Sequence, residues 1–342
     1  MKTRVTIIDL ARAADVSVST VDRIMNKRGP VQRATAEHVL AVAQEIGFTG
    51  VPSLRQRLSE DAPAKTLGFV LNKRERHLYG SFAKALADAT VASTKIKGKA
   101  IIRHVDEMSP RSIADALLGL ADECDVIAGV CIEHPRVNQA VHELAMRGIP
   151  FWALLSDLSA PHRAGFIGTN GWKLGRTAGW FMSRLCPPNS TIALLMGSEQ
   201  YLCQKDYESG FVNYLREVQS DFAMLPPQQT MEDDETAYRL TKRLLDENGS
   251  LTGIFMGGGG IDGVVRALQE RPSQKINVVS AEISDLTPKH LIDEVIDVAL
   301  SHEFGRVATL AVQTMESSII SHVPGVPVIH SVPMKISLRE NL

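Results

Sequence analysis

Apolar residues recur at intervals of three and four through the first 48 residues, a spacing that places them on one face of a helix. The pattern predicts three helices: one that begins after a T-x-x-D capping box at Thr6, one from Ser17 to about Asn26, and one from about Arg33 to Ile46. The pair Gly29-Pro30 separates the second helix from the third, and Gly47 ends the third. The amino-terminal segment is therefore predicted to be entirely helical.

The second of these helices has two different faces. Its apolar residues stand at positions 21, 24 and 25, on a stripe that is expected to face a core. The opposite face is polar and carries Ser19, Asp22, Arg23 and Asn26. Two short helices with a tight turn between them, the second capped by serine and polar on its outer face, are typical of a helix-turn-helix.

The pattern changes after a linker at 49–65, which contains two prolines, mixed charge and a possible short helix over 53–59. From residue 66 onward, short apolar runs alternate with amphipathic helices, which favours parallel sheets covered by helices on both faces. The runs fall into two series and predict nine strands: 66–71, 99–105, 124–132 and 149–155, then 164–168, 191–197, 251–257, 276–281 and 296–301.

The predicted fold class is α/β: an all-α helix-turn-helix headpiece followed by two doubly wound parallel-sheet subdomains. We expect the headpiece at 1–48, the linker at 49–65 and a large α/β domain at 66–342. Within that domain, the first lobe is predicted at about 66–160 plus 297–324 and the second at about 164–284 plus 327–340. The three crossings between the lobes are expected near 158–163, 284–296 and 323–327.

Composition adds little to this picture except where charge is uneven. The net charge is −2, but residues 1–60 carry nine Lys and Arg against six Asp and Glu, a net of +3, while the remainder carries −5. A basic head on an acidic body is compatible with nucleic-acid binding. The basic amino terminus has no unbroken apolar run, so it does not resemble a signal peptide, and no segment approaches the length of a membrane span.

The four cysteines are scattered without C-x-x-C spacing, which argues against a zinc site or a disulfide framework. We therefore expect a cytoplasmic protein with reduced thiols, no metal, no cofactor and no membrane partner.

The outer residues of the second predicted helix have the chemistry needed to read DNA bases. Arginine commonly binds guanine O6 and N7, which makes Arg23 the leading candidate, and Ser19 lies one helical turn before it. Val18 is suited to contact a thymine methyl group. The alternative is that this segment is a helical cap that only packs.

The segment VTIIDLARAADVSVSTVDRIMNKRGPVQRATAEHVLAVAQEIGF resembles the headpiece of the lactose/galactose-repressor (LacI/GalR) family of bacterial transcription regulators. The V-T-x-x-D start, the V-S-x-x-T-V-x-R core and the E-I-G-F end carry the resemblance. It implies that Val18, Ser19 and Arg23 are base readers and that Thr6, Ser17, Thr20 and Asn26 contact phosphates or cap helices. The two-sheet body resembles the family's effector domain, which is similar to type I periplasmic binding proteins. The resemblance implies that residues 66–342 are an effector-binding and dimerisation domain.

Two residues depart from the family pattern. Gln32 replaces a serine and weakens the cap of the third helix. Asp22 also stands where serine is common, and its charge is repelled by phosphates. It is suited either to accept from a cytosine amine or to pair with Arg23, Lys27 or Arg28, and we favour the pairing.

The linker contains LRQRLSED, where the family's hinge helix carries a leucine that wedges into the minor groove. Leu58 is the candidate wedge, with Leu54 as the competitor, and Arg55 and Arg57 are candidates for phosphate contacts. A plain linker without specific contacts is the alternative.

Polar residues at the carboxyl ends of the predicted strands are candidates for binding a ligand, because ligands of open parallel sheets bind at these ends. The candidates are Asn72, Lys73, His77, Tyr79, Glu133, His134, Ser156, Asp157, Asn170, Gln204, Tyr207, Gly258, Gly259, Glu282 and His302.

Sugar-binding relatives often carry an arginine where this chain has Tyr207 and an aspartate where it has a glycine of the run 257–260. A polar effector, most simply a sugar or polyol, is expected, but its identity stays open. The glycine run lacks the lysine of a phosphate-binding loop.

The sequence thus predicts a ligand-responsive repressor that binds double-stranded operator DNA as a homodimer or tetramer. A solute-binding protein without a regulatory role is one alternative. An enzyme that uses Glu282 and His302 as an acid–base pair is another, although no G-x-S-x-G or H-E-x-x-H motif supports catalysis.

Overall fold

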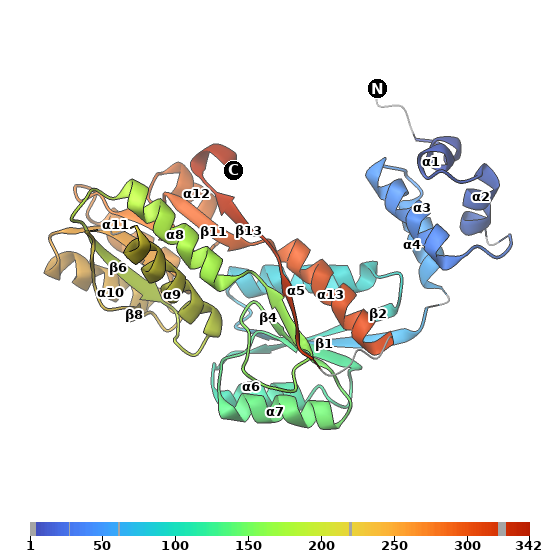
Figure 1. Cartoon of the computed structure of the whole chain (residues 1–342), viewed down its shortest axis with the longest axis horizontal. Coiled ribbons are helices and arrows are strands. Elements are labelled where there is room, and N and C mark those ends of the chain that lie inside the picture. The colour runs from blue at the N-terminus through green and yellow to red at the C-terminus, as the bar shows by residue number, and fades with distance from the viewer. Residues whose placement is uncertain (1–4, 27, 61, 219–220, 321–325) are drawn as a thin grey trace.

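The computed structural model describes residues 5–26, 28–60, 62–218, 221–320 and 326–342. They form a helical headpiece and two α/β lobes. The headpiece lies beside lobe 1, and lobe 2 lies at the other end of the molecule (Figure 1).

The headpiece contains four helices: α1 (Ile7–Ala13), α2 (Val18–Asn26), α3 (Arg33–Glu45) and α4 (Val51–Ser59). Its core includes Leu10, Val21, Val39 and Leu54, all fully buried. The capping box of Thr6 and Asp9 is confirmed, as is the left-handed Gly47 after α3, with a φ of 70°. Gln32 makes no side-chain cap, as its weak capping chemistry predicts.

Helix α4 belongs to the headpiece rather than to a free linker. Leu54 is inserted between the other helices, and the packing extends α4 two residues beyond the predicted start, to Val51. Leu58 is half-buried at the edge of the same core. The linker between α4 and the first strand is consequently only a few residues long.

Lobe 1 is built on a six-stranded, all-parallel sheet with the order β12-β5-β4-β3-β1-β2. Its strands are β1 (Ala64–Asn72), β2 (Lys97–Val105), β3 (Val126–Gly129), β4 (Phe151–Leu154), β5 (Gly165–Gly168) and β12 (Val328–Ser331). Its helices are α5 (His77–Ala92), α6 (Pro110–Leu118), α7 (Pro135–Met146) and α13 (Phe304–Ile320). Helices α5 and α13 cover one face of the sheet, and α6 and α7 cover the other (Figure 1).

Lobe 2 is built on a seven-stranded sheet with the order β13-β11-β10-β9-β6-β7, in which β8 also pairs with β6. Only β13 runs antiparallel to its neighbour. The strands are β6 (Thr191–Met196), β7 (Ala223–Met224), β8 (Gln228–Gln229), β9 (Leu251–Met256), β10 (Asn277–Ser280), β11 (Val298–His302) and β13 (Met334–Ser337). The helices are α8 (Gly171–Leu185), α9 (Leu202–Glu217), α10 (Asp234–Glu247), α11 (Ile261–Gln269), α12 (Thr287–Ile292) and the 3-10 turn η1 (Arg339–Asn341).

The cores follow this layering. One apolar cluster fills lobe 1, whereas lobe 2 has a separate cluster on each face of its sheet. The central strands β3, β4, β6 and β10 are buried along their whole length, which explains why they appear in the sequence as unbroken apolar runs.

The sheet topology corrects the predicted lobe boundaries. Strand β5 pairs with β4 and β12 in lobe 1, although 164–168 was expected in lobe 2. Strand β11 pairs with β10 and β13 in lobe 2, although 297–302 was expected in lobe 1, and β12 belongs to lobe 1 rather than lobe 2. A run of apolar residues in the sequence indicates where a strand lies, but not which distant strand it pairs with.

The chain therefore crosses between the lobes at 169–170, at 303 and at 332–333, one step beyond the end of β5, β11 and β12. The expected crossing at 158–163 is a loop within lobe 1, where Leu158 and Ala160 are buried. The expected crossing at 284–296 contains α12 of lobe 2, and most of the one at 323–327 lies outside the described residues.

The packing of α4 leads to a first expectation. Leu54→Ala should destabilise the headpiece by about 2–5 kcal/mol, because the Leu54 side chain is fully buried and its removal leaves a cavity in the core. Leu58→Ala is the matched control and should cost clearly less, since Leu58 is half-buried. Hydrogen exchange at the amides of α1–α3 measures both effects, and equal protection in the two variants would contradict this role of Leu54.

Candidate DNA-binding helix and interlobe cleft

Helix α2 presents a polar face to solvent. Ser17 caps it by accepting from the Thr20 amide at 3.0 Å, and the two hydroxyl oxygens lie 2.8 Å apart. Val21 and Ile24 are buried on the inner face. Ser19, Arg23 and Asn26 are exposed on the outer face together with Val18, which is 45% exposed. An apolar side chain so exposed at the start of a helix is available to contact a thymine methyl group.

Asp22 lies among donors of its own helix and of the following turn. Its carboxylate accepts from Asn26 Nδ2 at 2.6 Å and pairs with Arg28 at 3.6 Å. The expected pairing with Arg28 is thus present. The side chain of Arg23 makes no hydrogen bond or ion pair with any described residue, and Lys27 lies outside the described residues. Arg23 remains available to bind a partner.

The hinge candidates in α4 differ in how accessible they are. Leu54 is in the headpiece core and is not available as a minor-groove wedge, while Leu58 is half-buried. Arg57 is paired with Glu60 at 2.9 Å. Arg55 lies in a groove between the headpiece and lobe 1, where its buried Nε has no hydrogen-bond partner.

A cavity of about 60 Å³ lies between the lobes, at the carboxyl ends of their strands. It brings together the following sequence-predicted residues: Tyr79, Ser156, Gln204, Tyr207, Gly258, Gly259, Glu282 and His302. The helix and strand ends of both lobes contribute to it, as expected for a ligand cleft in facing parallel sheets.

Several of the predicted residues lie outside this cavity and have other partners. Asp157 pairs with Arg163 at 2.7 Å, and Asn170 accepts from the Lys173 amide at 2.8 Å as the cap of α8. His77 of lobe 1 pairs with Asp285 of lobe 2.

Glu133 and its neighbour also have structural partners. Glu133 accepts from the Ser159 amide at 2.7 Å and from Asn138 at 2.8 Å. His134 accepts from the Arg136 amide at 3.1 Å and caps α7. Lys73 does not line the cavity.

Asn72 lies directly behind the cavity wall and joins the lobes. It is buried and donates to the hydroxyl groups of Tyr79 at 3.1 Å and of Tyr201 at 2.5 Å. Tyr201 comes from lobe 2, and a second bond between the lobes runs from the Cys203 amide to Ser156 Oγ at 3.3 Å. The lobes are therefore closed on each other.

Two charged residues of the cavity were missed by the sequence analysis. Arg76, in the loop between β1 and α5, forms ion pairs across the cleft with Glu232 and Glu282 of lobe 2. Arg76 belongs to the charged run KRERH and Glu232 to the run EDDE, both of which resemble solvent-exposed loops. The position of Arg76 just after the first strand was the one signal that could have identified it.

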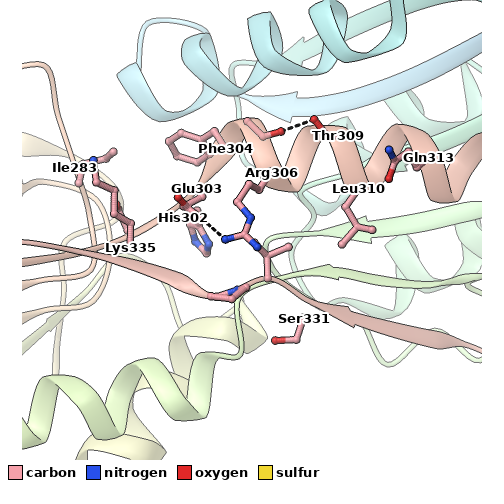
Figure 2. A pocket seen from close by; sticks show the side chains of 14 residues that line it. Ile283, His302, Glu303, Phe304, Arg306, Thr309, Leu310, Gln313, Ser331 and Lys335 are labelled. Atoms are coloured by element: carbon pink, nitrogen blue, oxygen red, sulfur yellow. Dashed lines mark hydrogen bonds and ion pairs between the residues drawn. The ribbon is translucent and has the colours of Figure 1, made fainter. Parts of the chain in front are cut away.

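A larger open pocket of about 900 Å³ borders the cleft along the crossings between the lobes (Figure 2). It shares only His302 with the interlobe cavity. Figure 2 shows Arg306 on α13 paired with Glu303, at 2.8 Å, beside His302. This pocket lies next to segments that must bend if the lobes open.

Among the described residues, no cluster of three or more His, Cys, Asp or Glu side chains is placed to hold a metal ion. None of the described helices is long and apolar enough to cross a membrane.

Comparison with known families gives two matches that together cover most of the chain. Residues 67–319 match the periplasmic binding protein domain, and residues 6–50 match the bacterial regulatory proteins of the lacI family.

Curated relatives are regulators. The chain is 24% identical over 275 residues to an uncharacterised HTH-type transcriptional regulator in the aml 5' region of Streptomyces limosus, covering 77% of this chain and 73% of the relative. It is 29% identical over 93 residues to the maltose regulon regulatory protein MalI of Escherichia coli, covering 27% of each chain.

Solved structures show the same fold in the body. A solute-binding protein of Agrobacterium vitis bound with α-D-tagatopyranose has a TM-score of 0.74 at 14% identity and covers 81% of this chain and 95% of its own. The glucose-galactose binding protein GanP of Geobacillus stearothermophilus has a TM-score of 0.70 at 18% identity, with 81% and 99% covered.

The burial of His302 leads to an expected pH effect. Burial lowers the pKa of His302 to about 4, and its Nδ1 lies 2.9 Å from Thr169 Oγ1. In the unfolded chain His302 takes up a proton near pH 6.5, whereas in the folded protein it does so only near pH 4. The free energy of unfolding should therefore be highest above pH 6.5 and decrease as the pH drops from 6.5 to 4. Between pH 7 and pH 4, the free energy of unfolding of His302→Gln should decrease by about 3 kcal/mol less than that of the wild type. Urea unfolding at both pH values measures the difference, and identical losses would show that His302 is not responsible.

Proposed function

This chain belongs to the lacI family of bacterial regulatory proteins, with a periplasmic binding protein domain behind its helix-turn-helix headpiece, and we propose that it acts in the cytoplasm as a repressor. Its operator affinity is set by a small polar effector bound between the lobes. The observation that carries the proposal is the exposed face of α2, where Arg23 is unpaired among the described residues.

Base reading is assigned to the first turns of α2. Val18, Ser19 and Arg23 face solvent there, and the recognition helix of a helix-turn-helix places such residues against base edges in the major groove. Asp22 positions Asn26 and Arg28 rather than reading a base itself, because both already donate to or pair with its carboxylate. Thr6 and Ser17 cap helices whose amino ends then face phosphates.

Effector binding is assigned to the interlobe cavity. The solved relatives include sugar-binding proteins of the same fold, and the cavity walls carry the hydroxyl, amide and carboxylate groups that bind polyols, which supports a sugar or polyol as the effector. The crossings at 169–170, 303 and 332–333 connect the two lobes and are suited to act as the hinge. Binding changes operator affinity only if the effector prefers the open or the closed lobes.

A homodimer is part of the proposal. One helix-turn-helix covers only a few base pairs, so a two-fold dimer on a pseudo-palindromic operator is needed for specific binding. The body is expected to supply the dimer contacts, since the headpiece is small. Sedimentation of the full chain at micromolar concentration tests this, and a monomer would contradict it.

The proposal is tested first at the DNA. The wild type should shift a fragment of the DNA upstream of its own gene in a gel-mobility experiment. Arg23→Ala should weaken operator binding by about 1–3 kcal/mol and relax the preference at one operator position, since one bidentate guanine contact is lost. Arg12→Ala, an exposed residue of α1, is the control that should retain the sequence preference. Unchanged affinity and specificity in Arg23→Ala would show that α2 does not read the bases.

A second experiment tests the coupling between cleft and DNA. A thermal-shift screen of sugars and polyols identifies a ligand, because one present at 100 times its dissociation constant adds about 2.7 kcal/mol of stability. That ligand should change operator affinity by about 5- to 150-fold in the wild type. His302→Ala should bind operator normally but lose the response. A wild type that binds the ligand without any change in operator affinity would overturn the regulatory role of the cleft.

A further inference from the structure

The carboxylates of Glu232 and Glu282 are held by lobe 2 itself, with one oxygen of each left over. Glu232 Oε1 accepts from Gln204 Nε2 at 2.9 Å and from the Gly259 amide at 3.2 Å. Glu282 Oε2 accepts from the Ile261 amide at 3.0 Å, at the amino end of α11. The other oxygen of each carboxylate points to the guanidinium of Arg76. Lobe 2 therefore contains a preformed pair of carboxyl acceptors. Burial raises the pKa of Glu282 to about 8, while the guanidinium of Arg76 acts to lower it.

The turn that carries Glu232 has an unusual backbone conformation. Met231 and Glu232 both lie in the left-handed region, with φ values of 56° and 58°. Two successive residues with a Cβ rarely adopt this conformation, and such strain is concentrated at functional sites. The strained turn directs the Glu232 side chain into the cleft, where it is buried to 7% exposure.

Arg76 supplies the counter-charge from the opposite lobe. It is the only positively charged side chain among the described residues that line the cavity. His302 also lines it, but burial lowers its pKa to about 4, so the imidazole is neutral at pH 7. The cavity thus contains two carboxyl groups and one cation, and that cation belongs to the chain itself.

The cavity is too small to admit an effector while Arg76 occupies it. Its volume is about 60 Å³, whereas sites for small molecules usually span about 300–1,000 Å³. An effector therefore enters only when Arg76 leaves lobe 2, either because the lobes open or because the side chain swings away. Glu232 and Glu282 are then each left with an unpaired oxygen in a desolvated site. Glu282, whose pKa burial raises to about 8, can take up a proton, whereas a cationic nitrogen in place of the guanidinium would pair with both carboxyl groups.

We propose that the effector carries a cationic nitrogen, as an ammonium or guanidinium group, that takes the place of Arg76 between Glu232 and Glu282. This inference rests on the proposed role of the cleft as the effector site and narrows the effector from sugars and polyols in general to their amino derivatives and similar organic cations. The tyrosine hydroxyls and Gln204 around the carboxylates are left to bind the polar remainder of the molecule.

The test uses the full chain and two probes of nearly the same shape. Arg76→Ala leaves the guanidinium site empty, and ethylguanidinium and ethylurea differ chiefly in charge. Isothermal titration at millimolar concentration should show ethylguanidinium binding to the Arg76→Ala protein more tightly than ethylurea by roughly tenfold or more. Equal binding of the two probes, or no binding of ethylguanidinium, would overturn the proposal.

Three further variants make the result specific. Arg74→Ala, a substitution of an exposed arginine in the same loop, keeps Arg76 in place and should bind neither probe. Arg76→Ala combined with Glu232→Gln and Glu282→Gln should lose the ethylguanidinium binding, and retained binding would show that the probe sits elsewhere. If Arg76→Ala does not give a wild-type circular dichroism spectrum, Arg76→Gln provides the same measurement with more of the side chain kept.

A gel-mobility experiment with wild-type protein and operator separates this inference from the proposed function. The gel-mobility experiment uses the wild type, in which Arg76 is intact. If the ethylguanidinium test fails while the wild type binds operator normally, only the proposed charge of the effector is overturned. If the wild type does not bind operator, the proposed function as a transcriptional regulator is overturned, whatever the titrations show.

Discussion

The ion pairs of Arg76 with Glu232 and Glu282 are the interaction on which the arrangement of the two lobes depends. Each partner is largely removed from water, and a buried charge without a partner is strongly unfavourable. The lobes therefore stay closed while Arg76 holds both carboxylates, and the hydrogen bonds of Asn72 and Ser156 to lobe 2 add to that closure. A ligand that opens or re-closes the cleft has to compensate for the lost ion pairs of Arg76 in addition to forming its own contacts with the lobes.

The headpiece is attached so that a change in lobe 1 can reach the DNA. Leu54 fixes α4 in the headpiece core, and β1 begins at Ala64, so few residues separate the two bodies. Arg33 also donates to the Thr94 carbonyl of lobe 1, and Arg55 lies in the groove between them. A rotation of lobe 1 is thus passed to the headpiece through a short, partly packed connection. In this arrangement α4 is an integral part of the headpiece and Leu58, not Leu54, is the leucine near its surface.

Local chemistry made part of this molecule predictable from its sequence. The capping box at Thr6, the serine cap of α2 and the left-handed Gly47 each depend on neighbours within four residues, and each is where the sequence placed it. Pairing between distant strands is not local, which is why β5 and β11 were assigned to the wrong lobes. Arg76 and Glu232 were missed because a charged run has the same pattern on a solvated loop as in a cleft, and the unusual backbone that directs Glu232 has no sequence signature.

The late position of β12 and β13 in the chain has a consequence for how the protein folds as it is synthesised. The headpiece core is complete once α4 has left the ribosome, so this unit is able to fold first. Neither sheet reaches its full complement of strands until residues 328–337 emerge, because β12 completes the edge of lobe 1 and β13 that of lobe 2. During most of translation a folded DNA-binding unit is therefore tethered to two unfinished lobes, and the cleft that would control it is assembled last.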